Sequence, residues 1–493
     1  MSAAMTRRAA ALLGLGEPEA LSALLPLVEA RGLEEVDVFV AALLASRSGE
    51  RDREVLLAAA LANRAPRVGH TAVDLVALDG AELGETPPPA ALPADRSGWR
   101  AQVAASVLVR EAGTEGATPL VLRGSLLYID RYFRYEDRLH HELSWRLAEA
   151  RPVADPVLME RGLDALFRAG SGAPTGEDPQ RQAAEQALRR GLTVISGGPG
   201  TGKTWTVRNL LTLLYAQAVA SGEATPRLAL AAPTGKAAAR VAESLRKGLQ
   251  DHLHRAVGAL PEGASIAELA AFLDASTPST LHRLLGWRPD QPTRFRHDRD
   301  HPLPVDVLLV DEASMVDLAL MSKLFDALPR HARVVLLGDR HQLASVEAGT
   351  VLGDLCGPTG APLQLSSPQH ARLAPLVPGL QGVQIAPAPG VWDGIVQLTR
   401  FWRFGASSGI GGVARAIQRG DVDTALAFLR GQYEVALDYF TRSLERQRSA
   451  ENLGNILCAL IRLGEHDEAT ELLDQIRSSF PSDLVDELDS IIA

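Results

Sequence analysis

Hydrophobic and polar positions along the chain follow two patterns, and the change between them lies near residue 180. In the first 95 residues, alanine and leucine recur at helical spacing, as in Ala20–Val28 and Val55–Ala62. From residue 180 onward, short apolar runs of strand type alternate with helical segments. The predicted strands are Leu192–Ser196, Leu228–Ala232, Val305–Val310 and Arg333–Leu337, and the predicted helices span 203–221, 235–254 and 316–328. This alternation predicts an α/β fold with a parallel sheet.

The segments between these regions have less regular patterns. Residues 101–150 combine a helix, short strands at Leu120–Leu122 and Leu126–Ile129, and an aromatic stretch from Tyr128 to Tyr135. The stretch 151–179 ends in clustered Gly, Pro and Ser, so we expect a linker there. Residues 357–393 are rich in Pro, Gly and Leu and predict an irregular segment.

The last part of the chain is helical in pattern and acidic. Apolar residues between Ala450 and Pro481 fit the spacing of a 34-residue tetratricopeptide unit, with a partial copy near Tyr433–Phe440. An ordinary amphipathic helical hairpin explains the same spacing, so both interpretations stay open. Residues 431–493 contain 5 Arg and 13 Asp or Glu, which accounts for most of the chain's net charge of −10.

Composition excludes several classes of protein. The 493 residues are 46% hydrophobic and 22% charged, as in globular chains. No apolar run is long enough to span a membrane, and the start of the chain has no signal-peptide pattern, so we expect a soluble cytoplasmic protein that does not contact a membrane. The two cysteines, Cys356 and Cys458, exclude a disulfide scaffold and a cysteine-rich metal site.

The strongest chemical motif is a phosphate-binding loop. The segment Gly197–Thr204 reads GGPGTGKT and lies between an apolar strand and a helix, the context in which this motif binds a nucleotide. Its glycines let successive backbone N–H groups face phosphate oxygens. Lys203 supplies a charge to the phosphates and Thr204 a hydroxyl to Mg²⁺. Lys203 is one of only four lysines against 46 arginines, which suggests a position that needs a compact ammonium.

Acidic and amide side chains follow the next strands. Asp311 comes directly after an apolar strand, where its carboxylate can hold the Mg²⁺ shell, and the adjacent Glu312 is suited to accept a proton from the attacking water. Gly338-Asp339 follows the next strand, although a Gly-Asp turn is common by itself. Gln342 could contact the γ-phosphate or the water.

A second candidate anion site lies at Pro233-Thr234-Gly235-Lys236, again between a strand and a helix. An ordinary turn with an exposed lysine explains this pattern nearly as well. No paired ligand spacing accompanies His282 or His341, so neither is expected to bind a metal.

Together these motifs resemble superfamily 1 DNA helicases and, within them, the RecD family of subunits of RecBCD-type exodeoxyribonuclease V. The resemblance is close over residues 180–357 and recognisable from about 118 to 430. It implies an ATP- and Mg²⁺-dependent motor that moves 5′→3′ on single-stranded DNA, or DNA with an end, beside RecB-like and RecC-like subunits in double-strand break repair by recombination.

The resemblance also assigns residues to roles. Gln180 would read adenine, and Arg403 would reach the γ-phosphate from a second motor domain. The nucleotide-binding set would be Gln180, Gly198, Pro199, Gly200, Thr201, Gly202, Lys203 and Thr204. Catalysis would use Glu312, Gln342 and Arg403. The single-strand track would be lined by Pro233, Thr234, Lys236, Thr280 and His282.

The resemblance implies a domain order. We expect a mainly helical, partner-docking N-terminal domain (1–150), a linker (151–179) and a RecA-like P-loop domain (180–357). A remnant of the second motor domain (358–430) and the acidic helical tail (431–493) would follow.

The sequence departs from the family after Arg403. Segments like the family's SGIG and AI-x-x-GD appear at 408–411 and 416–421, but its later T-x-H-K-x-Q-G and T-x-x-x-R-A-R segments do not. The bulky Trp205 after Lys203-Thr204 also differs from the family's usual small residue. An alternative function is therefore an ATP-binding interaction protein that lacks unwinding activity, and a frameshifted or fused motor derivative is a third.

Overall fold

The computed structural model describes most of the chain up to Leu398. The described residues are 24–80, 83, 92–167, 178–198, 200–274, 278–291, 294–340, 342, 348–357, 364–374, 384–387 and 390–398. Predictions for Pro199, for Arg403 and for the acidic tail lie outside these ranges. Within them, no helix combines the length and the apolar composition needed to cross a membrane.

The N-terminal part combines helices with a small sheet. Helix α5 (Arg53–Arg64) is buried over Val55–Ala62, so it forms the centre of this part. Asp52 caps it by accepting hydrogen bonds from the N–H groups of Glu54 and Val55. The other elements are α3 (Leu25–Glu29), α4 (Glu35–Ser48), η1 (Ala65–Val68), β1 (Ala72–Asp74), α6 (Arg96–Ala104), β2 (Val109–Glu111), β3 (Leu120–Arg123) and β4 (Leu126–Ile129). The four strands pair in the order β1-β4-β3-β2, and the two predicted strands are confirmed as β3 and β4.

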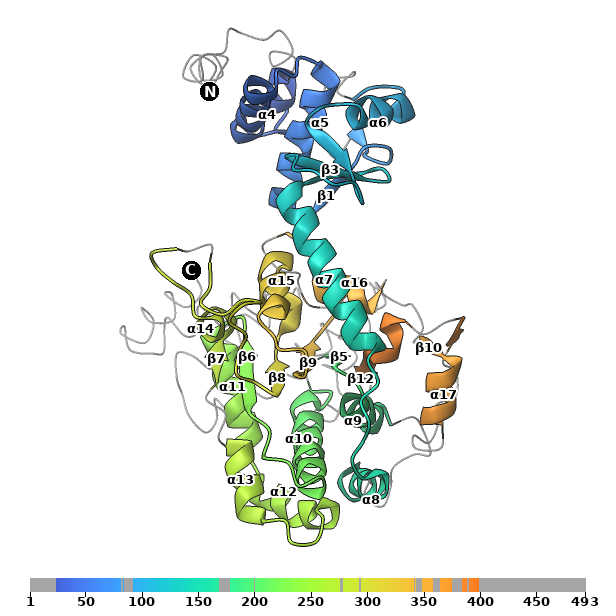
Figure 1. The fold of residues 1–493 in the computed structure, drawn as a ribbon, viewed down its shortest axis with the longest axis vertical. Helices are drawn as coiled ribbons and strands as arrows, with labels where there is room; N and C mark the ends of the chain where they lie inside the picture. The colour runs from blue at the N-terminus through green and yellow to red at the C-terminus, as the bar shows by residue number, and fades with distance from the viewer. Residues whose placement is uncertain are drawn as a thin grey trace, which may run out of the picture. The chain divides into compact units, whose positions relative to one another are not determined.

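A six-stranded parallel sheet forms the centre of the P-loop region (Figure 1). Its strand order is β12-β5-β9-β8-β6-β7. The strands are β5 (Leu192–Gly197), β6 (Leu228–Ala232), β7 (Ser279–Thr280), β8 (Val307–Val310), β9 (Arg333–Gly338) and β12 (Ile395–Leu398). Each neighbouring pair is parallel. The predicted α/β class with a parallel sheet is therefore confirmed.

Helices cover both faces of this sheet because successive strand residues point to opposite sides. Val194 packs into one core and the next residue, Ile195, into the other. The Ile195 side is covered by α8 (Pro156–Phe167), α9 (Pro179–Arg189), α10 (Lys203–Ala220), α11 (Gly235–Arg246), α12 (Leu249–Ala256) and α13 (Ile266–Asp274). The Val194 side is covered by α7 (Asp130–Ala148), α14 (Leu281–Leu285), α15 (Leu318–Asp326) and α16 (Val351–Cys356). Short 3₁₀ helices occur at η3 (Val257–Ala259) and η4 (Ala313–Met315).

The expected linker at 151–179 was wrong for residues 156–167, which form α8. Its apolar side chains at Leu158, Leu163 and Leu166 are buried in the same core as α10. The cluster of Gly, Pro and Ser that suggested a linker lies after this helix, so the composition of the whole stretch concealed a short amphipathic segment.

The single helix expected over 235–254 is two helices, α11 and α12. Lys247 takes an extended conformation and Gly248 follows with φ +69°. This left-handed conformation favours glycine, so Gly248 ends one helical direction and begins another. The apolar periodicity on either side is helical, which is why the pattern alone missed the break.

The segment 357–393, expected to be irregular, contains secondary structure. It includes β10 (Gln364–Ser366), α17 (Ser367–Leu373), β11 (Gln384–Ala386) and η5 (Val391–Gly394). The following strand, β12, pairs with β5. The P-loop sheet therefore continues to Leu398, and the boundary expected at residue 357 was too early.

Candidate active site

Three neighbouring strands end at one edge of the sheet, and each is followed by a residue that is a candidate for nucleotide or metal binding. Strand β9 lies between β5 and β8, with Gly338 opposite Ser196 and Leu336 opposite Val310. Because the strands are parallel, their carboxyl ends meet at this edge, where open α/β sheets bind ligands. Lys203, Asp311 and Asp339 are thereby brought together from distant parts of the sequence.

The phosphate loop leaves β5 and enters α10 through left-handed glycines. Gly200 and Gly202 have φ values of +82° and +88°, which side chains with a Cβ rarely adopt. The hydroxyl of the buried Thr201 donates a hydrogen bond to the Gly198 carbonyl at 2.8 Å. The Thr201 N–H donates to the same carbonyl at 3.4 Å, so the two contacts close the loop on itself.

Lys203 begins α10 and is surrounded by acidic residues. Its Nζ donates a hydrogen bond to the Gly197 carbonyl. Burial lowers the pKa of Lys203, while the charges of Asp339, Asp311 and Glu312 oppose that shift. The ammonium therefore lies among all three carboxylates. This proximity meets the main requirement of the phosphate-loop interpretation, that Lys203 and Asp311 lie on the same side of the sheet.

Asp311 and Glu312 follow β8 in different conformations. Burial raises the pKa of Asp311 and the charge of Glu312 adds to the shift, whereas the Glu312 N–H and Lys203 lower it. Glu312 has φ +51° and ψ +39°, a left-handed conformation shared among described non-glycine residues only with Arg31. Such a conformation costs about 1–3 kcal/mol and is typical of functional sites.

Gly338 allows the turn after Glu312 to lie against the end of β9. A Cβ at this position would lie 2.3 Å from Leu352 Cδ2 and 3.2 Å from the Ser314 nitrogen. A side chain would therefore force the buried Leu352 side chain to move and would crowd the start of the segment at Ser314. The glycine before Asp339 is required by this close packing, a reason that the sequence motif did not reveal.

Asp339 is more central to the site than its sequence context suggested. It is only 5% exposed, and of the three carboxylates it acts most strongly on Lys203. The Gln342 N–H donates to the Asp339 carbonyl at 3.1 Å and closes a turn. The side chain of Gln342 is exposed, so it is available to a bound ligand.

Two further residues predicted to bind the nucleotide lie on helices. Gln180 is buried in the first turn of α9, a helix that packs against α10. Thr204 is the second residue of α10 and is partly exposed. Their contacts with a nucleotide stay predictions, as do those of Pro199 and Arg403, which lie outside the described residues.

The donor set suits a divalent metal held mainly by one carboxylate and the nucleotide. Asp339, Asp311 and Glu312 all act on the charge of Lys203, so three carboxylates are available near one ammonium. Within the described ranges, no three His, Cys, Asp or Glu side chains form a closed metal site. Mg²⁺ is typically bound through one or two carboxylates, water and phosphate oxygens, so Asp311 and Thr204 fit that arrangement.

The predicted DNA-binding residues also gather at one place. Ala232 at the end of β6 pairs with Thr280 at the end of β7. Thr234 and Thr280 each cap the following helix by accepting a hydrogen bond from the N–H of Ala237 or Arg283. A Cβ on Gly235 would lie 3.9 Å from Thr280 Cγ2, so the two turns are in contact distance. Pro233 lies in the first of these turns, and Lys236 is exposed beside it.

Aromatic side chains lie next to this pair of turns. His282 is exposed and packs edge-on against Phe295, with ring centroids 5.8 Å apart. Trp287, 46% exposed, pairs with Phe295 through an isolated β-bridge. Sequence reasoning missed Trp287, although a tryptophan between a glycine and an arginine in a polar loop could have indicated it. Exposed aromatic rings are suitable platforms for stacking nucleic-acid bases.

Comparison with known protein families finds matches over two parts of the chain. Residues 29–128 match the N-terminal domain of the RecBCD enzyme subunit RecD, and residues 180–348 match an AAA domain. The chain is 40% identical over 448 residues to the RecBCD enzyme subunit RecD of Mycolicibacterium smegmatis, covering 88% of this chain and 68% of the relative.

Two further relatives extend the comparison. The RecD subunit of Mycobacterium tuberculosis strain H37Rv is 41% identical over 406 residues, which are 82% of this chain and 59% of that protein. The ATP-dependent RecD2 DNA helicase of Deinococcus radiodurans is 33% identical over 224 residues, 45% of this chain and 26% of that protein. The chain thus spans about three fifths to two thirds of the length of the mycobacterial relatives. The resemblance inferred from the motifs is confirmed: the chain belongs to the RecD family of RecBCD helicase subunits.

Proposed function

We propose that this chain is the ATP-hydrolysing, 5′→3′ DNA-translocating subunit of a RecBCD-type helicase–nuclease acting in the repair of double-strand breaks. The observation that carries the proposal is the meeting of Lys203, Asp311 and Glu312 at one edge of the sheet. A phosphate loop beside a buried acidic pair is the arrangement that ATP-driven motors need. The RecD relatives support the partners, which would be RecB-like and RecC-like subunits and DNA with an end.

The hydrolysis step assigns one role to each residue. Lys203 neutralises the β- and γ-phosphates, and its protonated state is favoured by the three nearby carboxylates. Glu312 accepts a proton from the water as the water oxygen bonds to the γ-phosphorus. The bond to the β–γ bridging oxygen breaks, and that oxygen leaves with ADP. Gln342, at the end of the Asp339 turn, would contact the γ-phosphate or the water.

Other groups complete the nucleotide site. Mg²⁺, held by Thr204 and Asp311, would supply charge neutralisation at the phosphates. Gln180 would select adenine, and Arg403 would stabilise the γ-phosphate during transfer. An arginine of this kind contributes about 10³- to 10⁵-fold to turnover in related phosphoryl transfers.

The DNA strand would run over the turns at the ends of β6 and β7. Lys236 supplies a phosphate contact beside the turns at Thr234 and Thr280, each of which caps the helix that follows it. His282 and Trp287 add exposed rings for base stacking. This surface and the phosphate loop share the carboxyl edge of one sheet, so the proposed DNA track lies on the same edge as the nucleotide site.

ATP hydrolysis with and without single-stranded DNA tests the proposal. The purified chain should hydrolyse ATP faster when an oligonucleotide is added, and Lys203→Ala should abolish both rates. Lys247→Ala, which removes an exposed lysine at the far end of α11, is the matched control and should leave them unchanged. A rate of ATP hydrolysis that single-stranded DNA does not raise would contradict the proposal. Hydrolysis that persists in Lys203→Ala would also contradict it.

A second function is favoured by one sequence observation. The late helicase segments that normally contact DNA and the γ-phosphate are missing from the sequence after Arg403. On this reading, the chain binds ATP and partner subunits but does not separate strands. A strand-displacement assay distinguishes the two, because only the motor function predicts unwinding that Lys203→Ala abolishes.

A further inference from the structure

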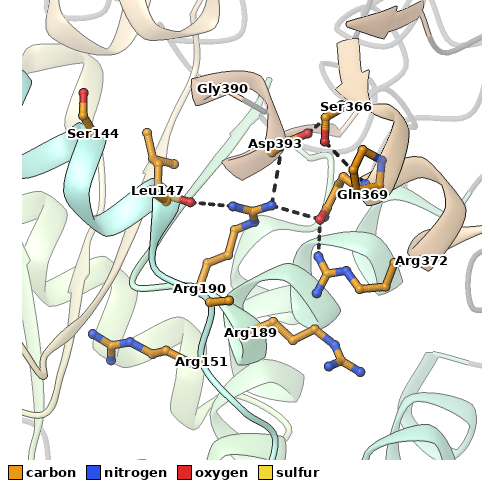
Figure 2. A pocket seen from close by; sticks show the side chains of 13 residues that line it. Ser144, Leu147, Arg151, Arg189, Arg190, Ser366, Gln369, Arg372, Gly390 and Asp393 are labelled. Atoms are coloured by element: carbon orange, nitrogen blue, oxygen red, sulfur yellow. Dashed lines mark hydrogen bonds and ion pairs between the residues drawn. The ribbon is translucent and has the colours of Figure 1, made fainter. Parts of the chain in front are cut away.

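A cavity lined by arginines lies at the opposite edge of the P-loop sheet. It has a volume of about 580 Å³, within the range of about 300–1,000 Å³ typical of small-molecule sites. Its walls come from the end of α7, the end of α9, α17 and η5 (Figure 2). The charged residues that line it are Arg151, Arg189, Arg190, Arg372 and Asp393.

The cavity is separate from the nucleotide edge. Arg190 precedes β5, and Asp393 precedes β12, so both lie where these parallel strands begin. Lys203 follows the opposite end of β5. A strand of six residues spans about 20 Å, so a ligand in the cavity would not touch the phosphate loop directly.

Two guanidinium groups share one acceptor in the cavity. Arg190 and Arg372 both donate to the single Oε1 of Gln369, as Figure 2 shows. The Nε2 of Gln369 and the Nε of Arg190 are buried and have no hydrogen-bond partner within the described residues. Gln369 is only 3% exposed, so its unpaired amide is costly unless a ligand satisfies it.

The charge balance also favours an anion. Four guanidinium groups meet three carboxylates, since Glu185 lies 2.7 Å from Arg189 and 3.4 Å from Arg372, Glu149 pairs with Arg151, and Asp393 lines the wall. One positive charge is left in excess. The arginine forks match the oxygens of phosphate and carboxylate groups, which they can bind in bidentate fashion.

Asp393 adds a requirement for donors on the ligand. Its Oδ1 accepts a hydrogen bond from the Ser366 N–H at 2.7 Å. Its Oδ2 is buried, has no hydrogen-bond partner among the described residues, and lies 3.8 Å from Arg190 Nη2. A ligand with one anionic end and hydroxyl groups elsewhere satisfies both the arginines and this oxygen.

We propose that the cavity binds the phosphate group of a small organic phosphate. The phosphate would meet Arg189, Arg372 and the Gln369 amide, and a hydroxyl of the ligand would donate to Asp393. Leu147, Ala148 and Pro368 supply the apolar part of the wall. This site is independent of the proposed motor activity, because none of its lining residues belongs to the nucleotide edge.

Calorimetry on the full chain carrying Lys203→Ala tests the site, because this background weakens phosphate binding at the loop. Inorganic phosphate and ribose 5-phosphate should each bind saturably, and ribose 5-phosphate should bind more tightly because its hydroxyls can reach Asp393. Adding Arg189→Gln should weaken both by about tenfold or more, the loss expected for one charge-assisted contact. Adding Arg53→Gln, which replaces an exposed arginine on α5, should change the affinity for neither phosphate.

Several outcomes would overturn the proposal. Failure of both phosphates to bind would do so, as would binding that Arg189→Gln leaves intact. Succinate that binds while both phosphates fail would assign the cavity to carboxylates instead. The melting temperature of each variant without ligand checks folding. Arg189→Lys, which keeps the charge and loses the fork, gives a second test and should also weaken phosphate binding.

Discussion

Asp339, at the end of β9, is the carboxylate that acts most strongly on the ammonium of Lys203, which follows β5. The two residues are 136 positions apart in the sequence but follow neighbouring strands. Asp311, after β8, is one strand further away and acts less strongly. The middle strand of the three therefore carries the residue that most supports the charge of the phosphate-loop lysine.

Replacing Asp339 with Asn should shift the alkaline limit of ATP binding. Burial already lowers the pKa of Lys203, and Asp339 opposes that shift. ATP affinity depends on the protonated lysine, so it is present below the pKa of Lys203 and is lost as the pH rises through it. Without Asp339 this pKa falls further, and affinity should be lost at a lower pH.

Titration of a fluorescent ATP analogue from pH 7 to pH 10 measures this limit. Asp300→Asn, at an exposed position outside the nucleotide edge, is the control and should behave like the unmodified chain. An alkaline limit that is identical in Asp339→Asn and the unmodified chain would show that Asp339 does not support the lysine.

Gly338→Ala should destabilise the P-loop domain. The added methyl group would lie 2.3 Å from Leu352 Cδ2, and overpacking of this kind costs about 1–3 kcal/mol. Because Asp339 follows directly, ATP affinity should fall as well. Denaturant unfolding compared with Gly353→Ala provides the test, since a Cβ at Gly353 meets only ordinary contacts, the nearest at 3.5 Å. Equal stability of the two variants would contradict the packing argument.

His252 should make the domain less stable in mild acid. It is fully buried, its Nε2 lies 2.8 Å from the Thr212 hydroxyl, and burial, with Arg208 and Arg255, lowers its pKa from 6.5 to about 4. Between these values the unfolded chain binds a proton that the folded chain does not. The free energy of unfolding should therefore fall as the pH drops from about 6.5 toward 4, by about 2 kcal/mol between pH 7 and pH 5.

Denaturant unfolding at pH 7 and pH 5 isolates this contribution when His252→Gln is compared with the unmodified chain. The variant should lose less stability on acidification, even if it is less stable at pH 7. An equal loss in both proteins would indicate that His252 keeps its ordinary pKa.

Lys236→Ala should weaken single-stranded DNA binding and reduce its salt dependence. Removing one phosphate contact should lower the slope of log affinity against log salt by about 0.7. Lys247 is exposed at the other end of the same helix, so Lys247→Ala loses the same charge away from the proposed track. Fluorescence anisotropy of a labelled oligonucleotide at several salt concentrations distinguishes them. Identical slopes for the two variants would exclude a specific contact at Lys236.

Local motifs and strand periodicity predicted β5, β6, β8 and β9 of the P-loop sheet, whereas β7 and β12 were not predicted. The loop at Lys203 and the acidic pair after β8 each carry their signal within a few neighbouring residues. The importance of Asp339 could not be predicted in the same way, because it depends on β9 lying between β5 and β8. Neighbouring strands in a sheet need not be neighbours in the sequence.

The features that sequence reasoning missed all depend on contacts between residues far apart in the sequence. Helix α8 is held by packing against α10, while the Pro- and Gly-rich sequence near it suggested a linker. The cavity combines Arg151, Arg190, Arg372 and Asp393, which are separated by up to 242 positions. No local spacing connects them, so only the folded chain brings the donors together.

The most direct test of the motor proposal is to separate ATP binding from hydrolysis with Glu312→Gln. The amide keeps the shape of the side chain but cannot accept the proton from water, so ATP should still bind with nearly normal affinity. Single-stranded DNA-stimulated hydrolysis should fall by about 10²-fold or more, since general-base catalysis contributes about 10²- to 10⁴-fold. Hydrolysis at the unmodified rate in Glu312→Gln would contradict the assignment of this edge of the sheet as the catalytic site.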